Sequence, residues 1–266
     1  MSDWRSYDTV AEAYERIAAP RFQIVARHLL TLAGPKPGAR LLDLGTGTGA
    51  VPAAAGEMRA RPGTVVGCDL SPDMLARARS VVPLLRAVRA DVLGLPFQDG
   101  SFDLVTANCV LSHVRDQQAV LREIGRVLAR PGSFASSSWE MVSDPYTVAW
   151  RELLEAAVGA GAVARAGEAV APLEGHFASA QNVRDALLEA GFTSVRVEPV
   201  SLAFTHPVEE YIADRALGSS GRLGRHLLGS DAWSRFLAAT ESEFRRRFGE
   251  TVACERKLLL AVGTPD

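Results

Sequence analysis

An acidic residue, Asp43, lies in the apolar run Leu41–Leu44, and the glycines Gly45, Gly47 and Gly49 follow it directly. Glycine lets a backbone turn tightly and come close to a ligand, and a helix that begins after such a turn offers free N–H groups to polar ligand atoms. A second acid, Asp69, ends another apolar run about twenty residues later, where related folds place the residue that binds ribose hydroxyls. These residues predict a site for a nucleoside-type cofactor.

The spacing of the glycines narrows the kind of cofactor. Dinucleotide-binding folds use G-x-G-x-x-G to accommodate a pyrophosphate, whereas this chain has G-x-G-x-G with Asp43 two residues before Gly45. A carboxylate at that position would repel a pyrophosphate and would suit a cationic ligand. An NAD-type oxidoreductase is the alternative, and it is disfavoured by this spacing and by the lack of an S-x-x-x-Y-x-x-x-K motif.

Strands and helices alternate along most of the chain. Apolar residues at helical spacing between Phe22 and Leu32 stop at the breaker cluster Gly34–Gly38, and the first strand follows. The alternation predicts an α/β domain with a parallel sheet covered on both faces. The alanine- and glycine-rich stretch Gly159–Gly167 is expected to be flexible. The predicted strands are Leu41–Leu44, Val65–Cys68, Val88–Ala90, Phe102–Ala107, Ser133–Ser138, Val195–Phe204 and Lys257–Val262.

Composition excludes several other classes. A net charge of −2 and scattered arginines give no electrostatic footprint for nucleic acid. The stretch Met1–Asp8 is polar and no apolar run is long enough to span a bilayer, so a cytoplasmic protein is expected. The isolated cysteines Cys68, Cys109 and Cys254 predict neither disulfides nor a zinc site, and the chain has no H-E-x-x-H motif for a catalytic metal.

The chain resembles the class I S-adenosylmethionine-dependent methyltransferases, and among them the ubiquinone/menaquinone-methyltransferase-like branch that modifies small molecules. The resemblance covers residues 7 to 139 and is specific as a set of segments. Besides the two strand ends above, these segments are Tyr7–Asp8 with Ala11–Glu15, Ala90–Phe97 with Asp99–Val105, Asn108–Val114, and Arg122–Phe134, which is similar to the family's helix and turn before its fifth strand.

The resemblance implies a Rossmann-like, seven-stranded, mostly parallel sheet with the last strand antiparallel, helices on both faces, and a helical cap. A cofactor-binding core would comprise residues 1–139, 179–206 and 250–266. Residues 140–178 and 207–249 would form the cap, which binds the acceptor. The cap aromatics Trp150, Tyr211, Trp233 and Phe236 could shape an apolar pocket, although for each residue singly packing within the cap is the favoured interpretation.

The same resemblance implies roles for individual residues toward S-adenosyl-L-methionine. Asp43 would support the ammonium group, Asp69 would hold the ribose, and Tyr14 would close over the methionine carboxylate. Asp43 could instead be a strand-end acid bonded to backbone amides, and Asp91 a turn acid. The complete set of cofactor residues is Tyr14, Asp43, Gly45, Thr46, Gly47, Gly49 and Asn108 toward the methionine end, Asp69 at the ribose, and Leu70, Met74, Asp91 and Val92 at the adenine.

A catalytic base is harder to assign from sequence. His113 follows the fourth predicted strand at the mouth of the crevice and is the first candidate, because a phenolic oxygen needs a base that titrates near neutrality. A capping role is the simpler alternative for this histidine. His176 and His206 lie at the borders of the cap segments, whereas His28 and His226 are expected on helix surfaces.

The sequence thus predicts an S-adenosylmethionine-dependent methyltransferase acting at oxygen or carbon of a small, hydrophobic or aromatic molecule. No catalytic metal, nucleic acid or membrane span is expected, and the chain would be a monomer or homodimer. A second alternative is an enzyme that binds the same cofactor without transferring its methyl group, such as a cyclase, because a fold does not dictate a reaction.

Overall fold

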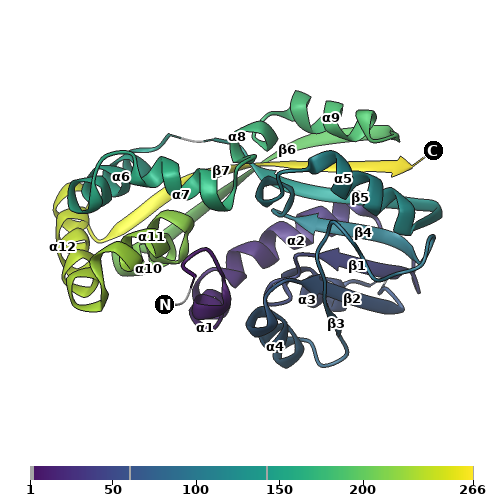
Figure 1. Ribbon diagram of the computed structural model, residues 1–266, viewed down its shortest axis with the longest axis horizontal. Helices are drawn as coiled ribbons and strands as arrows, with labels where there is room; N and C mark the ends of the chain where they lie inside the picture. The colour runs from purple at the N-terminus through teal and green to yellow at the C-terminus, as the bar shows by residue number, and fades with distance from the viewer. Residues whose placement is uncertain (1–2, 60, 142, 266) are drawn as a thin grey trace.

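The computed structural model describes residues 3–59, 61–141 and 143–265 (Figure 1), so the polar N-terminal stretch is described only from Asp3. Its centre is a seven-stranded sheet in the order β3-β2-β1-β4-β5-β7-β6. The first five strands are parallel, and β7 runs antiparallel to both β5 and β6, as predicted. The strands are β1 (Arg40–Leu44), β2 (Thr64–Asp69), β3 (Arg86–Arg89), β4 (Phe102–Asn108), β5 (Leu128–Trp139), β6 (Phe192–Pro207) and β7 (Thr251–Pro265).

Helices cover both faces of the sheet, and the residues of β1 alternate between them. Leu41 packs in the apolar cluster formed with α2 (Ala19–Ala33) and α3 (Ala50–Glu57). Leu42 packs in the opposite cluster, formed with α5 (Gln117–Val127) and α9 (Ala180–Glu189). This alternation is the period-2 pattern of a strand buried on both faces, and it confirms the predicted fold class.

The segment expected as a turn before the fifth strand is an irregular part of β5. Phe102 pairs with Leu128 and Leu104 pairs with Ser133, so the residues between Leu128 and Ser133 bulge out of register with β4. The helix α5 ends at Val127, directly before this strand. The helix and strand were therefore predicted correctly, and the turn between them is accommodated as a bulge.

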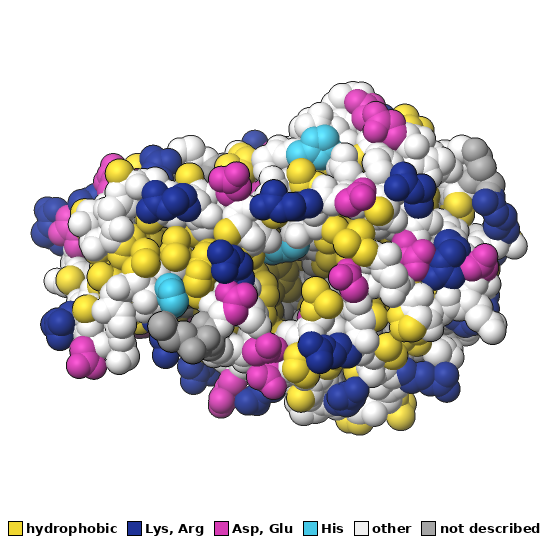
Figure 2. Space-filling model, in the orientation of Figure 1, with side chains coloured by type: hydrophobic (Ala, Val, Ile, Leu, Met, Phe, Trp, Pro, Cys, Tyr) yellow, Lys and Arg dark blue, Asp and Glu magenta, His cyan; other side chains and the backbone are white. Residues whose placement is uncertain are grey.

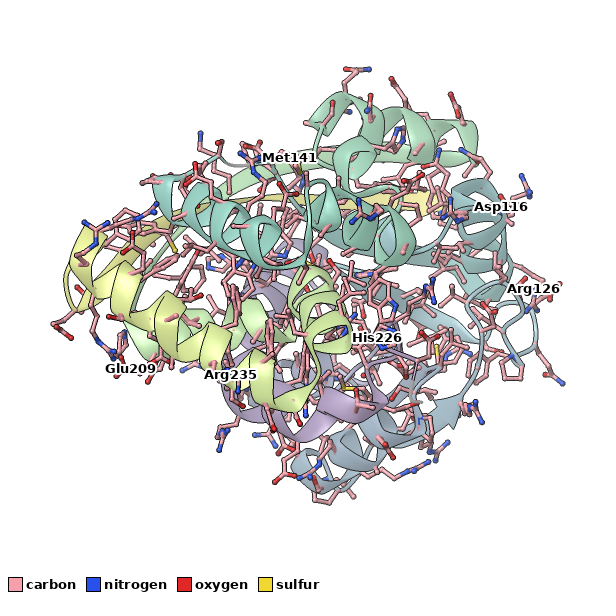
Figure 3. All side chains as sticks on the ribbon, turned by 60° about the vertical axis from the view of Figure 1, so that its left-hand side comes forward. Asp116, Arg126, Met141, Glu209, His226 and Arg235 are labelled. Atoms are coloured by element: carbon pink, nitrogen blue, oxygen red, sulfur yellow. The ribbon has the colours of Figure 1, made fainter. Side chains whose placement is uncertain are left out.

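The outer halves of β6 and β7 extend beyond the sheet and carry the cap (Figure 1). Around this ribbon lie α6 (Pro145–Val158), α7 (Ala162–Val170), α10 (Val208–Leu217), α11 (Ser219–Leu228) and α12 (Ser230–Phe248). In Figure 3, Glu209 and Arg235 lie on the cap, Asp116 and Arg126 lie on the core, and Met141 lies where the chain crosses between them.

The cap has an aromatic core of its own. Trp150 is 1% exposed, packs edge-on against Trp233 and Phe236, and shares a cluster with Tyr211 and other cap residues. The apolar side chains Val252 and Cys254 of β7 belong to the same cluster. The aromatic residues of the cap therefore pack mainly against one another, which is the interpretation favoured for each of them from sequence.

The expectation of a flexible stretch at Gly159–Gly167 is wrong. Helix α7 occupies most of it, and Ala162 and Ala166 are 1% and 0% exposed against Leu223 of α11. Small side chains let two helix backbones approach closely, so a composition typical of a linker serves here as a packing face. The intrinsic helix propensity of alanine also favours a helix here, because alanine is the best helix former.

A short N-terminal region lies between the cap and the sheet (Figure 1). It consists of η1 (Asp8–Val10) and α1 (Ala11–Ile17), and it packs through Val10, Tyr7 and Tyr14 against Leu217 of α10. The remaining helices are α4 (Pro72–Val81), η2 (Leu111–His113) and α8 (Glu174–Phe177). None of the helices in the described ranges is both long and apolar enough to cross a membrane.

Candidate functional site

A small pocket of about 40 Å³ opens at the carboxyl end of β1, within the hollow between cap and core that Figure 2 shows. The structure brings together many of the predicted cofactor residues here, and adds four residues that sequence reasoning missed: Phe22, Thr48, Ala50 and Val51. The predicted residues that line the pocket are Tyr14, Asp43, Gly45, Thr46, Gly47 and Asn108. The predicted ribose and adenine residues lie outside this pocket, nearer α4 and the loop after β3.

Asp43 is buried at the base of the pocket. Its side chain accepts a hydrogen bond of 2.8 Å from the hydroxyl of Thr106, its register partner on β4. Burial raises the pKa of the Asp43 carboxyl to about 7, against its usual value of 3.8. Near neutral pH the carboxyl is thus poised between its two states, and a cation in the pocket would favour the ionised one.

The glycine turn is shaped by two different constraints. Gly45 and Gly47 both have left-handed backbone angles, with φ of +58° and +53°. A Cβ on Gly45 would come within 2.7 Å of the Val110 side chain, whereas a Cβ on Gly47 would meet nothing closer than the Gly45 carbonyl at 4.0 Å. Gly45 is therefore required by the protein itself, and Gly47 leaves open space where the pocket lies.

Gly49 has a packing reason rather than a pocket contact. A Cβ at this position would lie 3.4 Å from Ala78 of α4, and the Gly49 N–H donates to the Thr46 carbonyl at 2.9 Å. The predicted contact of Gly49 with a cofactor stays a prediction.

Replacing Gly47 with alanine is expected to weaken binding of S-adenosylhomocysteine about tenfold, because the methyl group would project into the pocket. Calorimetric titration would measure this. Gly38→Ala is the matched control, since Gly38 also has a positive φ of +79° with open space around it but lies away from the pocket. Equal affinities of the two variants would contradict the assignment of Gly47.

Asp69 joins the end of β2 to the glycine turn. One carboxylate oxygen accepts the N–H of Gly47 at 2.9 Å, and the other accepts the N–H of Ser71 at 2.9 Å. A carboxylate has further lone pairs beyond those two bonds, so Asp69 can still accept from a pair of hydroxyl groups. Burial raises the pKa of Asp69 above its usual value, and the hydrogen bonds from backbone N–H groups oppose that effect.

The predicted adenine residues occupy varied environments. Met74 is buried and Leu70 is 61% exposed, an unusual exposure for a large apolar side chain beside a site. Asp91 is exposed and accepts the Leu93 N–H at 3.0 Å, which is the turn geometry considered as its alternative role. Val92 packs partly against the core. The second carboxylate oxygen of Asp91 takes no part in that hydrogen bond. The contacts of these residues with an adenine stay predictions.

Tyr14 forms one wall of the pocket. Its ring stacks on Phe22 with centroids 5.7 Å apart and meets Tyr7 edge-on at 5.8 Å. Burial raises the pKa of the Tyr14 hydroxyl well above its usual value, so this group is a neutral donor at physiological pH. A neutral donor suits the predicted contact with a carboxylate.

Asn108 and Cys109 form the end of β4. The Asn108 side chain accepts from the Ser137 hydroxyl at 2.7 Å and donates to the Phe22 carbonyl at 3.2 Å, so a carbonyl contact to the cofactor would come from its main chain. Cys109 has φ of +60°, a conformation that side chains disfavour and that is found preferentially at functional sites. Burial raises the pKa of its thiol to about 11, which excludes a reactive thiolate near neutrality.

His113 lies on η2, outside the residues that line the pocket. Its Nδ1 is 2.8 Å from the carbonyl oxygen of Val170, and a carbonyl only accepts, so Nδ1 carries the proton. Surrounding protein atoms lower the pKa of His113 below its usual value, although the residue is exposed at the surface. In the neutral form Nε2 is then free to accept a proton. The catalytic role stays a prediction.

The other histidines are less well placed. His206 lies 4.0 Å from Glu210 at the outer end of β6, and His28 and His226 are exposed on helices as expected. The Nε2 atom of His176 is buried without a hydrogen-bond partner among the described residues.

A further residue near the site was not found from sequence. Arg21, on α2, donates to Asp214 of α10 at 2.6 Å, and its guanidinium lies 5.2 Å from the centroid of the Phe22 ring. Tyr14 stacks on the same Phe22 ring, so Arg21 lies beside the aromatic wall of the pocket. Only its position in three dimensions reveals it, because its partner is far away in the sequence.

Comparisons with known proteins point to one family of enzymes. Residues 42–136 match the model of a methyltransferase domain. The malonyl-[acyl-carrier protein] O-methyltransferase of Halorhodospira halophila is 34% identical over 262 residues, covering 94% of this chain and 82% of that protein. Nocamycin O-methyltransferase of Saccharothrix syringae is 36% identical, covering 71% and 72%. The ubiquinone/menaquinone C-methyltransferase of Shewanella sp. (strain W3-18-1) is 36% identical but covers 40% and 44%.

Solved structures share the fold at low identity. Phosphoethanolamine N-methyltransferase 2 of Haemonchus contortus, in complex with S-adenosyl-L-methionine, superposes with a TM-score of 0.58 at 19% identity, covering all of this chain and 61% of that one. The [4+2]-cyclase SpnF superposes with a TM-score of 0.53 at 18% identity, covering 91% and 81%. At this identity the likeness establishes the architecture alone.

Proposed function

This chain belongs to the class I S-adenosylmethionine-dependent methyltransferases, and we propose that it transfers the methyl group to an acidic oxygen of a small, largely apolar molecule. The relatives that match cap and core together, over 94% and 71% of the chain, are named as O-methyltransferases. The C-methyltransferase relative matches only 40%. Because the cap lies over the site where an acceptor must enter, similarity that includes the cap is the better guide to the acceptor.

The observation that carries this proposal is the position of Arg21 beside the pocket. Only Asp214 among the described residues receives an N–H from its guanidinium, so further N–H groups are available to an anionic oxygen. Arg21 also lies against Phe22, which lines the pocket. The cofactor supplies an electrophilic methyl group, and Arg21 would hold the acceptor oxygen in line with it while the surrounding apolar walls exclude water.

The need for a base depends on the acceptor. A carboxylate or enolate oxygen is already ionised near neutrality, and Arg21 alone would orient it. A phenolic oxygen would need to lose a proton, for which Nε2 of His113 is the candidate acceptor. The name of one relative contains malonyl-[acyl-carrier protein], whose malonyl group carries a carboxylate, so an acidic oxygen on a carbon chain is the first class to test.

Methyl transfer with a deuterium-labelled cofactor tests this function directly. Purified protein would be incubated with malonyl thioesters, enols, phenols, quinols and amines, and the products analysed by mass spectrometry. We expect a labelled methyl group on oxygen. A labelled methyl group on carbon or nitrogen would refute the oxygen assignment, and a rearranged product without added mass would indicate a cyclase of the kind that this fold also hosts.

Replacing Arg21 with glutamine is expected to raise the KM for the acceptor about tenfold, because a charge-assisted hydrogen bond to the acceptor oxygen is lost. Asp214→Asn is the matched control, since it breaks the same ion pair but retains the cation. Steady-state kinetics would compare the two variants. A similar rise in KM for both would mean that Arg21 serves only to join α2 to α10.

Several finer features belong to the same proposal. We propose the division into a core of residues 1–139, 179–206 and 250–266 and a cap of 140–178 and 207–249, a cytoplasmic location, no nucleic-acid partner, and a monomer or homodimer. The separate apolar clusters of cap and core support the division, although Phe177 packs with the core and Val252 and Cys254 of β7 pack with the cap. Light scattering after size-exclusion chromatography would decide the oligomeric state.

A further inference from the structure

A buried arginine of the cap binds the N-terminal segment. Arg222 of α11 is 4% exposed, and no carboxylate within the described residues accepts from its guanidinium. It donates instead to three main-chain carbonyls, those of Trp4 at 2.9 Å, Leu217 at 2.8 Å and Arg5 at 3.4 Å. Burying a charge is costly unless it is well bonded, so these carbonyls are what allow Arg222 to lie inside the protein.

The aromatic ring of Tyr7 completes the environment of Arg222. The guanidinium carbon lies 4.0 Å from the ring centroid, a cation–π distance. On its other sides, Tyr7 meets Tyr14 edge-on at 5.8 Å and His113 at 6.4 Å. Tyr14 lines the cofactor pocket. A continuous set of contacts therefore runs from the cap helix through Tyr7 to the pocket wall.

The next residue links the segment to the other side of the site. Asp8 accepts a hydrogen bond from the Ser71 hydroxyl, and the Ser71 N–H donates to Asp69 at 2.9 Å. The Ser71 bond lowers the pKa of Asp8, so Asp8 is ionised near neutrality. The segment from Trp4 to Asp8 thus contacts both the methionine side and the ribose side of the predicted cofactor site.

The pocket under this segment is small. Its volume is about 40 Å³, and the residues that line it belong to the methionine end of the predicted site, whereas the predicted ribose and adenine residues lie outside it. Tyr14 forms one wall and is in contact with Tyr7, so the position of the N-terminal segment sets the room at this end of the site. If the N-terminal segment alone moved away, Arg222 would lose the carbonyls of Trp4 and Arg5 and the face of Tyr7, and the Leu217 carbonyl would be its one remaining acceptor among the described residues.

We propose that Arg222 is a latch that couples the N-terminal segment to the cap. The segment opens together with the cap, and it closes over the cofactor only when α11 is in place. Arg222 is a positioning residue in this scheme, because it acts through Tyr7 and the main chain and does not touch the predicted site. The proposal concerns cofactor exchange and does not depend on which acceptor the enzyme uses.

The release rate of S-adenosylhomocysteine tests the latch. Radiolabelled S-adenosylhomocysteine would be bound to the protein and chased with excess unlabelled compound. We expect Arg222→Met to release it about tenfold faster and to increase trypsin cleavage after Arg5 in the bound state. Arg225→Met is the matched control, since Arg225 lies exposed on the same helix, and it should behave as wild type.

A double-mutant cycle separates the latch from a general structural role. Tyr7→Leu should also accelerate release, and the Arg222→Met/Tyr7→Leu pair should be no faster than the faster single variant, because both break one chain of contacts. Arg222→Lys keeps the positive charge, so it should release S-adenosylhomocysteine more slowly than Arg222→Met does. Effects of Arg222 and Tyr7 that multiply, or a normal release rate in Arg222→Met, would overturn the proposal. If Arg222→Met fails to fold, the release rates of Tyr7→Leu and Arg222→Lys decide the question.

Discussion

Replacing Asp69 with alanine is expected to reduce the affinity for S-adenosylhomocysteine by about two orders of magnitude. Two ribose hydroxyl groups would lose a charged acceptor, and each such hydrogen bond contributes about 1.5–3 kcal/mol. The same change removes the acceptor for the N–H groups of Gly47 and Ser71, so the glycine turn keeps only the bond from the Thr46 N–H to the Cys68 carbonyl among its described hydrogen bonds to β2. Both losses are expected to weaken binding of S-adenosylhomocysteine. Calorimetric titration is the appropriate measurement.

Asp69→Asn separates the two consequences. An asparagine keeps one oxygen that can accept from Gly47 or Ser71, but it lacks the negative charge and the full set of acceptors. We expect an affinity between those of the wild type and Asp69→Ala. An unchanged affinity in Asp69→Ala would show that the ribose assignment is wrong.

Asp43→Asn is expected to weaken S-adenosylhomocysteine binding at slightly alkaline pH by about tenfold or more, because the cofactor's ammonium group loses its counter-charge. Because the pKa of Asp43 in the free protein is about 7, wild-type affinity should increase as the pH rises through this value. The ammonium would bind the ionised carboxylate, so binding below pH 7 must release a proton. The asparagine variant should lose this pH dependence, which titrations at several pH values would show.

The same carboxyl predicts an opposite effect on the stability of the free protein. Its pKa is raised on folding from 3.8 to about 7, so the folded state binds more protons than the unfolded state between these values. The stability that Asp43 contributes is present below the lower value and is lost as the pH rises through 7. Asp43→Asn should therefore melt at a higher temperature than wild type above pH 7 while binding cofactor less well. Lower stability together with normal binding would contradict the account.

Sequence was a good guide where the chemistry is local. The strand Leu41–Leu44, its following glycines and Asp69 lie within a short stretch of the chain. Each can be recognised from its own segment: the strand from its apolar residues, the glycines from a turn that needs a positive φ, and Asp69 from its place at the end of a strand. The resemblance added the position of Tyr14 at the pocket and the antiparallel last strand, which the pattern of apolar residues alone could not order.

Sequence was a poor guide where partners are distant. Arg21 meets Asp214, and Arg222 meets the carbonyls of Trp4 and Arg5, across most of the length of the chain. No local motif marks such pairs. The helix α7 was missed for a related reason: alanine and glycine are equally compatible with a linker and a tight helix contact, and only the presence of α11 selects the second.

Titration of the purified protein with S-adenosylhomocysteine, with NADH as the control, tests the central claim most directly. The claim is that the glycine turn, Asp43 and Asp69 together form a site for this cofactor class. We predict saturable binding of S-adenosylhomocysteine in the micromolar range, lost in Asp69→Ala, and no binding of NADH. Binding of NADH in its place, or of neither compound, would contradict the account of the site.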